Sequence, residues 1–171
     1  DLRALIARLE RDNRLRRIAK SVDRTWEPGS LVKWMFQALP DDRRFAMLFE
    51  NVAGSSMPLL IGAIGASAAH VATAIGTDPA GINRTLAAAL GRAVPPVVVE
   101  DAPVGAVVTT GDAVNLGALP IPTWTPGKDA APYITTMVVT KNAQTGARNM
   151  GIYRTQVDDD RHVLVNLSPN R

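Results

Sequence analysis

The stretch TGARNMGIYRTQV, residues 145–157, decides how the second half of this sequence is interpreted. Its apolar and β-branched side chains are typical of a strand that returns from a hairpin. Asn149, Gly151 and Arg154 interrupt that pattern, although Asn and Gly are depleted in strands because neither packs well on a pleated surface. The departure predicts that this strand has a binding function in addition to a structural one.

The residues around this stretch predict an antiparallel meander. A meander of this kind fits part of a β-barrel with more strands than the chain itself contains. The predicted elements are a strand at 133–141 (YITTMVVTK), a hairpin loop at 142–147 (NAQTGA), a return strand at 148–157, a turn at 158–161 (DDDR) and a third strand at 162–168 (HVLVNLS).

The first part of the chain, residues 1–94, predicts alternating helices and strands, and therefore an α/β or α+β layer. Leu2, Leu5, Ile6 and Leu9 recur with helical spacing after a possible cap at Asp1. Further helices are predicted at 30–39, opened by Ser30, at about 66–75, and at about 79–92, with Asp78 as N-cap and Pro79 in the first turn; strands are predicted within 15–22, 45–52 and 57–65.

The character of the sequence changes at Pro95, where β-branched runs separated by Gly, Pro and Asp replace helical periodicity. We therefore predict two domains, 1–94 and 95–171. Within the second, residues 118–136 (ALPIPTWTPGKDAAPYITT) are too rich in proline for a regular element. Two interpretations remain open: a rigid linker, or a preset loop that brings the YITT segment to a ligand.

Composition excludes several classes of protein. Hydrophobic residues make up 46% and charged residues 20% of the 171, as in ordinary soluble domains. The absence of cysteine excludes disulfides, Fe–S clusters, thiolate zinc sites and a Cys nucleophile, and suits a reducing cytoplasm. A net charge of +3 with only 5% aromatic residues argues against a nucleic-acid binder. The apolar run 59–76 is rich in Gly and Ala and contains His70, so we expect a buried segment there and not a membrane span.

Familiar catalytic and cofactor motifs are missing. GAIG at 62–65 lacks the rest of a dinucleotide or phosphate-loop fingerprint. His70 and His162 stand alone without metal-ligand spacing, and each is predicted to be structural. No Ser-His-Asp set can be proposed.

Asn149 and Arg154 together carry the strongest chemical signal. Being five residues apart, they would face opposite sides of a regular strand, and Gly151 would permit the bulge or twist that brings both to one ligand. An Asn oxygen suits a hard cation, and an Arg fork suits phosphate or carboxylate. The pair suggests a metal-bridged phosphate beside a carboxylate substrate; the alternative is a polar edge strand.

Three segments together resemble the N-terminal part of the UbiD family: LFENVAGSSMPLLIG, VVTTGDAVNLGALPIPTWTPGKDAAPYITT and TGARNMGIYRTQV. These enzymes are reversible, non-oxidative decarboxylases of aromatic and unsaturated acids that use prenylated FMN. The resemblance extends from about residue 2 to the end of the chain. It implies an N-terminal α/β domain at 1–94 and, at 95–171, the first antiparallel strands of a split β-barrel that binds the flavin.

The resemblance also implies roles for individual residues. Asn149 matches the Asn that holds a divalent ion, typically Mn2+, bridging to the flavin phosphate, and the backbone near Ala147 would lie beside a K+ site. Arg154 matches the catalytic Arg that orients the substrate carboxylate and contacts the flavin. The other cofactor-binding residues implied are Ile152, Tyr153, Asn166, Leu167, Ser168 and Arg171.

The sequence departs from the family at two points. Asn170 stands where many members have a metal-binding His, so Asn170 either substitutes for it or the His lies beyond Arg171. The family's acidic metal ligand, its catalytic glutamates and its dimerising domain would also follow Arg171, and no Glu occurs after Glu100. We therefore expect this chain to be an N-terminal part that lacks the acid.

The resemblance implies a cytoplasmic lyase for an aromatic acid, with prenylated FMN, Mn2+ and K+ as cofactors, a flavin prenyltransferase as supplier and a homo-oligomer as assembly. The segment WTPGKDAAPY favours hydroxybenzoate-type substrates. Two other functions remain open. A non-catalytic module could complete a site with a partner chain, and would be followed by a native stop codon and a neighbouring partner gene. An ordinary flavin-binding split-barrel reductase would bind unmodified FMN as tightly as the prenylated form.

Overall fold

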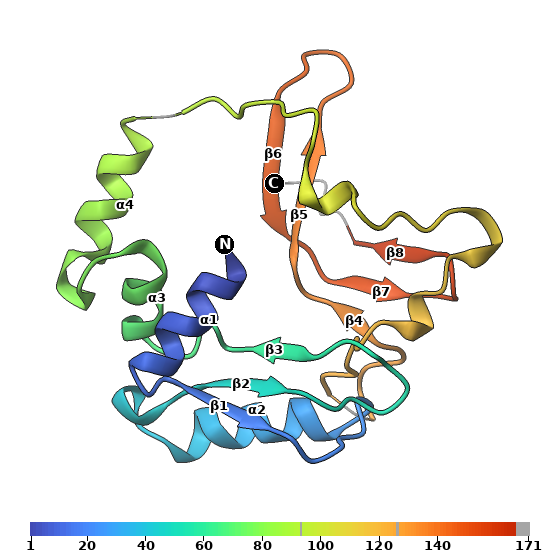
Figure 1. The fold of residues 1–171 in the computed structure, drawn as a ribbon, viewed down its shortest axis with the longest axis horizontal. Helices are drawn as coiled ribbons and strands as arrows, with labels where there is room; N and C mark the ends of the chain where they lie inside the picture. Colours follow the sequence, from blue (N-terminus) through green and yellow to red (C-terminus); the bar gives the residue numbers. More distant parts are fainter. Residues whose placement is uncertain (93, 126, 167–171) are drawn as a thin grey trace. The chain divides into compact units, whose positions relative to one another are not determined.

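The computed structural model describes residues 1–92, 94–125 and 127–166 (Figure 1). The chain forms two compact units. The first contains Asp1–Ala19, Val32–Phe49 and Leu60–Val114, and the second contains Lys20–Leu31, Glu50–Leu59 and Asn115–Arg171. Each is described by itself below.

The first unit is a three-stranded sheet with helices. Strands β1 and β2 are parallel, with Leu15 opposite Ala46, and the sheet order is β1-β2-β3. The elements are α1 (Leu2–Arg11), β1 (Leu15–Ile18), β2 (Ala46–Phe49), β3 (Leu59–Ile61), α3 (Ala68–Ile75) and α4 (Ile82–Leu90), with α2 (Glu27–Ala38) shared between the two units.

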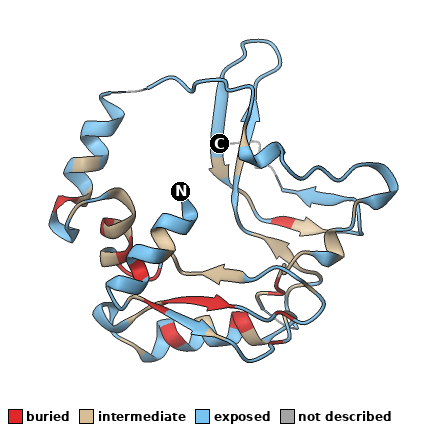
Figure 2. Cartoon of the chain, viewed as in Figure 1, coloured by how far each residue is buried: buried red, intermediate tan, exposed pale blue. Residues whose placement is uncertain are grey.

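The core of the first unit lies between α1 and the sheet. Asp1 caps α1 by accepting the Ala4 N–H at 2.9 Å, which confirms the predicted start of this helix. Leu9 is fully buried and clusters with Leu15 and Leu48. All four residues of β2 are buried, as Figure 2 shows, so the predicted buried strand at 45–52 is confirmed in its central part.

Two predicted helix starts differ from the structure. Helix α2 begins at Glu27 and not at Ser30. The Glu27 carboxylate accepts the Asp23 N–H at 2.6 Å, and the Asp23 carboxylate accepts the Thr25 N–H at 2.8 Å, so the two acids start the helix earlier. The segment predicted as one helix at 79–92 is a short 3-10 turn, Pro79–Gly81, followed by α4; Asp78 caps that turn as predicted.

The second unit contains two small antiparallel sheets. One has the order β4-β7-β8 and the other pairs β5 with β6. The hairpin loop between β5 and β6 lies where it was predicted, closed by the Asn142 N–H donating to the Ala147 carbonyl at 2.8 Å. The strands are β4 (Tyr133–Ile134), β5 (Met137–Lys141), β6 (Arg148–Ile152), β7 (Thr155–Val157) and β8 (Val163–Val165).

The prediction of continuous strands at 133–141 and 148–157 was wrong. Each is two strands, because the chain passes from one sheet to the other at residues 135–136 and again at 153–154. Strand β6 pairs regularly with β5 through Gly151, so the irregularity follows Ile152 and is not a bulge at the glycine. The position of Arg154 is set by this break.

His70 is structural, as predicted. It is fully buried, with Nδ1 at 2.7 Å from Ser67 Oγ and Nε2 at 3.0 Å from the Arg14 carbonyl. Because a carbonyl can only accept, Nε2 carries the proton and Nδ1 accepts from the Ser67 hydroxyl. The imidazole therefore ties α3 to the residue that precedes β1.

Burial lowers the pKa of His70 below its usual value, since the charged ring would be desolvated. The stabilisation from neutral His70 is therefore complete above about pH 6.5, the usual pKa of an unfolded His, and decreases as the pH falls below it. We expect urea denaturation to show this acid-side loss, and His70→Gln to flatten it. His162→Gln is the control: because the hydrogen bond with Asp159 raises the pKa of His162, this variant loses a contribution of the opposite sign, so the acid-side loss should persist and not flatten. An unchanged slope in His70→Gln would contradict the assignment.

Candidate functional site

Arg154 occupies the break between β6 and β7 and is held from two sides. Its Nη2 donates to Asp129 Oδ1 at 2.8 Å, and its guanidinium carbon lies 4.2 Å from the centre of the Tyr133 ring. The Arg154 side chain is 55% exposed, whereas that of Asp129 is only 10% exposed. A charge-assisted hydrogen bond and a cation–π contact thus fix the direction of a guanidinium that solvent can reach.

Asp129 is itself fixed by the proline-rich loop. Its Oδ2 accepts the Thr125 N–H at 2.8 Å, and its own N–H donates to the Thr125 carbonyl at 2.8 Å. The hydrogen bond from Arg154 is the largest cause that holds the pKa of Asp129 below its usual value. Asp129 is therefore a carboxylate over the whole neutral range, and its partner stays attached.

Tyr133 is the second support for Arg154. Its hydroxyl donates to Gln156 Oε1 at 2.8 Å, across the β4–β7 pair, and its carbonyl accepts the Trp124 indole N–H at 2.9 Å. The loop packs closely on the start of α2, where a Cβ at Gly29 would lie 2.8 Å from the Trp124 carbonyl oxygen. These contacts show that the loop is fixed to its neighbours, as both the rigid linker and the preset loop would require.

A hollow of about 350 Å³ lies beside Arg154. Its size falls in the range of small-molecule sites, and its lining combines one cation, amide groups and aliphatic side chains. Two predicted site residues, Arg154 and Asn166, come together here, whereas the predicted Leu167, Ser168 and Arg171, like Asn170, lie outside the described residues. The lining residues are Tyr133, Arg154, Gln156, Leu164, Val165 and Asn166.

Asn149 lies on β6, opposite Thr140 of β5. Its Nδ2 donates to the Tyr153 hydroxyl at 3.1 Å, so the amide oxygen faces away from that bond. Gly151 makes the contact possible, because a Cβ there would lie 2.9 Å from the Tyr153 ring. The glycine is needed for the close approach of Tyr153, which in turn orients the Asn149 amide.

Ile152 lies on a different face of the same hairpin. Met137 pairs with Ile152, and Val139 pairs with Met150, so these four apolar side chains form one stripe. All four are exposed. Asn149, Ile152 and Tyr153 are not among the described residues that line the hollow at Arg154. The structure thus places the predicted residues in two neighbouring groups of the second unit, one on the hairpin and one at the hollow.

The described part of the chain contains no group of three or more His, Cys, Asp or Glu side chains arranged to hold a metal. Within the same residues, no helix is long and apolar enough to cross a membrane.

Sequence reasoning did not single out Asp129 or Gln156, and it considered Tyr133 only as part of the YITT segment. The signals available were an acid in a proline-rich connector and a tyrosine at the start of the following strand. Neither identifies a partner, because Asp129 lies 25 residues from Arg154 in the chain.

Two family profiles match the chain. Residues 6–90 match the 3-octaprenyl-4-hydroxybenzoate carboxy-lyase N-terminal domain, and residues 95–171 match the 3-octaprenyl-4-hydroxybenzoate carboxy-lyase Rift-related domain. Both are UbiD domains, and together they account for nearly the whole sequence. The chain belongs to the UbiD family.

Solved structures of UbiD-class enzymes have the same fold. An evolved dimeric form of HmfF from Pelotomaculum thermopropionicum, in complex with prFMN, is 34% identical, with a TM-score of 0.86 over 98% of this chain and 38% of that protein. Vanillic acid decarboxylase of Sedimentibacter hydroxybenzoicus, in open form, is 26% identical, with a TM-score of 0.81 over 96% of this chain and 36% of that protein.

A third structure, the apo 3,4-dihydroxybenzoic acid decarboxylase of Enterobacter cloacae, is 24% identical and shares the fold, with a TM-score of 0.80 over 100% of this chain and 37% of that protein. The chain therefore spans less than two fifths of the length of the enzymes it matches.

Removal of the Asp129 charge should make the Arg154 side chain more mobile. In Asp129→Asn the charge is lost but the shape is kept, so we expect the Arg154 guanidinium NMR signals to shift and exchange faster. The free energy of unfolding should fall by about 1 kcal/mol, the upper range for a partly exposed pair. The control is Asp158→Asn, in the exposed turn before β8, which should change neither. Unaltered Arg154 signals in Asp129→Asn would show that the ion pair does not fix the guanidinium.

Proposed function

We propose that this chain is the N-terminal part of a reversible, non-oxidative carboxy-lyase that acts on an aromatic carboxylic acid with prenylated FMN. The observation that carries the proposal is the Arg154 guanidinium, held by Asp129 and Tyr133 at the edge of a hollow. The guanidinium has five N–H donors, of which the contact with Asp129 uses one, so its other donors can bind a substrate carboxylate. Among its relatives, HmfF was solved with prFMN.

We also propose that residues 1–94 form the N-terminal α/β domain and that residues 95–171 begin a split β-barrel for the flavin. The two family matches, which end at residue 90 and begin at residue 95, support this division. The antiparallel pairs β5–β6 and β4–β7–β8 are the kind of strands that such a barrel would contain.

The residues of the β5–β6 hairpin fit the flavin on chemical grounds. Asn149 offers an amide oxygen, the donor type that hard cations such as Mn2+ prefer, so it would hold the cation that bridges to the flavin phosphate. The exposed apolar stripe that includes Ile152 suits a planar ring. Tyr153 would hold the Asn149 amide, and the backbone near Ala147 would contribute to a K+ site. Asn166, with Leu167, Ser168 and Arg171, would contact the flavin from the following strand.

Bound prenylated FMN supplies the electron sink for the carbon atom that loses carbon dioxide. The contribution of this chain is to orient the substrate: Arg154 would hold the carboxylate, and Tyr133 and Gln156 would set the width of the hollow. The acid that protonates the product would come from outside the described residues. We infer a hydroxybenzoate-type substrate, which the segment WTPGKDAAPY supports together with the likeness to vanillic acid decarboxylase.

We infer an oligomeric assembly as well. An evolved form of HmfF was solved as a dimer, which supports this inference. The exposed stripe of Met137, Val139, Met150 and Ile152, which the flavin would cover in the carboxy-lyase, would instead face a separate partner chain in an accessory module, so that alternative predicts flavin binding only after the partner is added.

The function is tested by co-expression of the protein, in its native length, with a flavin prenyltransferase. We expect carbon dioxide release from hydroxybenzoates by the protein that carries prenylated FMN, and not by protein that carries unmodified FMN. Tight binding and reductase activity with unmodified FMN would contradict the proposal and favour the flavin reductase.

Arg154 provides the second test. Arg154→Ala should lower kcat/KM by roughly 100-fold, because a misplaced carboxylate loses its reactive orientation, while flavin content stays near that of the wild type. The kcat/KM of Arg154→Lys should lie between those of Arg154→Ala and the wild type, since an ammonium group cannot form the two parallel hydrogen bonds of a guanidinium. Lys141→Ala, at the far end of the hairpin, is the control. A kcat/KM for Arg154→Ala close to that of the control would contradict the role of the clamp.

Asn149 provides the third test of the proposed function. Asn149→Ala should lose bound Mn2+ and retain less flavin, measured by metal analysis and by the absorption of the purified protein. Asn149→Asp, which keeps an oxygen ligand, should restore the metal. Equal metal content in all three proteins would exclude Asn149 as a ligand.

A further inference from the structure

We propose that the first unit carries a binding site for a small ligand with a planar ring and a phosphate group, such as a mononucleotide. The site is a hollow of about 480 Å³ between the turn after α1 and the segment that precedes β2. Four arginines and two aromatic side chains line it: Arg14, Arg16, Arg43, Arg44, Trp34 and Phe45.

The backbone explains why the arginines face one side. Asn13 has φ = 56°, a left-handed turn that ends α1 and directs the chain into β1. Arg14 and Arg16 are two residues apart along an extended segment, so their side chains leave on one face while Leu15, between them, enters the core. The His70 bond to the Arg14 carbonyl holds this segment in place.

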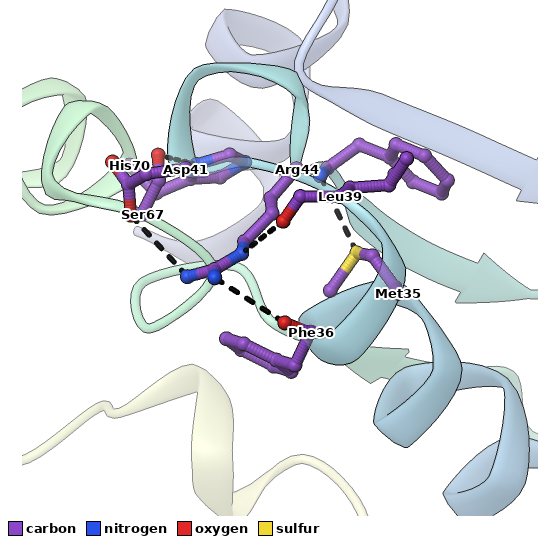
Figure 3. Close-up of polar contacts among 8 residues, drawn as sticks. Met35, Phe36, Leu39, Asp41, Arg44, Ser67 and His70 are labelled. Atoms are coloured by element: carbon purple, nitrogen blue, oxygen red, sulfur yellow. Dashed lines mark hydrogen bonds and ion pairs between the residues drawn. The ribbon is translucent and has the colours of Figure 1, made fainter.

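Two of the arginines are structural. Arg44 donates through Nε to the Leu39 carbonyl at 3.1 Å and through Nη2 to the Phe36 carbonyl at 3.3 Å, as Figure 3 shows, and it lies over the Phe36 ring. Arg16 donates to the Asn13 and Leu15 carbonyls and lies over the Phe45 ring. These contacts form the wall of the hollow.

The other two are available to a ligand. Within residues 1–92, 94–125 and 127–166, the guanidinium groups of Arg14 and Arg43 make no hydrogen bond and no ion pair. Arg14 is also half-buried, so its charge is partly removed from water. Two such cations on one hollow repel each other, and an anion with several oxygen acceptors would relieve that repulsion through charge-assisted bonds.

The charge balance favours an anion. Four guanidinium groups face two carboxylates, those of Asp12 and Asp42, and one of the four, Arg44, also has an ion pair at 3.4 Å with Asp41, which lies outside the lining. Asp12 already has a cation at 3.5 Å, the Nε of Arg11, which lies outside the lining. The net charge of the lining is therefore positive, and a nearby phosphate would be attracted.

Trp34 is the residue that favours a ligand with a planar ring. The residue is 54% exposed and forms part of the wall of the hollow, so a ligand in the hollow can reach its ring. Planar rings stack on Trp and on guanidinium planes, and stacking beside a phosphate contact is how proteins hold nucleotides. A volume of about 480 Å³ falls in the range of sites for ligands of that size.

The test uses AMP, adenosine and inorganic phosphate as probes, with isothermal titration and Trp fluorescence. We expect AMP to bind about tenfold more tightly than either half alone, and added salt to weaken it. Arg14→Gln and Arg43→Gln should each weaken AMP about tenfold, the effect of one charge-assisted hydrogen bond. Trp34→Leu should reduce the advantage of AMP over phosphate.

Matched controls separate this site from general charge and from the flavin. Arg3→Gln, which removes one exposed cation from α1, should leave AMP binding unchanged, and unchanged thermal unfolding of Arg14→Gln would confirm that it folds. Asn149→Ala, which removes the proposed flavin-side metal ligand, should also leave AMP binding intact, so failure of the carboxy-lyase proposal would not affect this one.

Three results would overturn the proposal. One is the lack of saturable AMP binding at millimolar concentrations. Another is an equal weakening of AMP binding by Arg3→Gln and Arg43→Gln, which would show that AMP is held by general electrostatic attraction. The last is binding of an acidic peptide or of single-stranded RNA with no competition by AMP, which would assign the hollow to a macromolecular partner.

Discussion

The contact between Arg154 and Asp129 organises the second unit. It joins the break between β6 and β7 to the proline-rich loop, and the same guanidinium stacks on Tyr133 of β4. Three segments that are separate in sequence therefore meet at one side chain. Because the carboxylate is nearly buried and the guanidinium is half exposed, the pair anchors the cation without hiding it. An arginine held in this way can recognise a carboxylate with little loss of side-chain entropy.

The hairpin shows how far the sequence alone could lead. Its strands and loop were predictable, because turn residues and β-branched runs act locally. The passage of the chain between two sheets at 135–136 and 153–154 was not predictable, because strand partners depend on segments far away in the sequence. Gly151 was recognised as exceptional, but its role is the close approach of Tyr153 and not a bulge. The start of α2 was missed because the Glu27 carboxylate accepts the Asp23 N–H and the Asp23 carboxylate accepts the Thr25 N–H, and neither bond belongs to the apolar pattern.

The residues of the candidate site also divide into those that the sequence identified and those that it missed. Asn149 and Arg154 were identified because their side chains do not suit a strand, and the structure gives each a defined partner. The supports Asp129 and Gln156 were missed because single polar residues in a loop or a strand carry no signal of their partner. The proposed binding roles would account for the unusual residues as a group, since a stretch used for binding is where local rules of stability are expected to fail. In the first unit, Arg14 and Arg16 stand in the sequence as two charged residues that follow a helix. Only the fold places them in the lining of the same hollow as Trp34.

The central claim is that the β6–β7 segment presents Asn149 to the phosphate side of a prenylated flavin and Arg154 to the substrate carboxylate. The most direct measurement is a crystal structure of the native-length protein with prenylated FMN, Mn2+ and a hydroxybenzoate, with anomalous data at the manganese edge. The account predicts a manganese peak bonded to the Asn149 amide oxygen and to the flavin phosphate, with the substrate carboxylate on Arg154. A manganese ion bound elsewhere, or a carboxylate that does not contact Arg154, would contradict it.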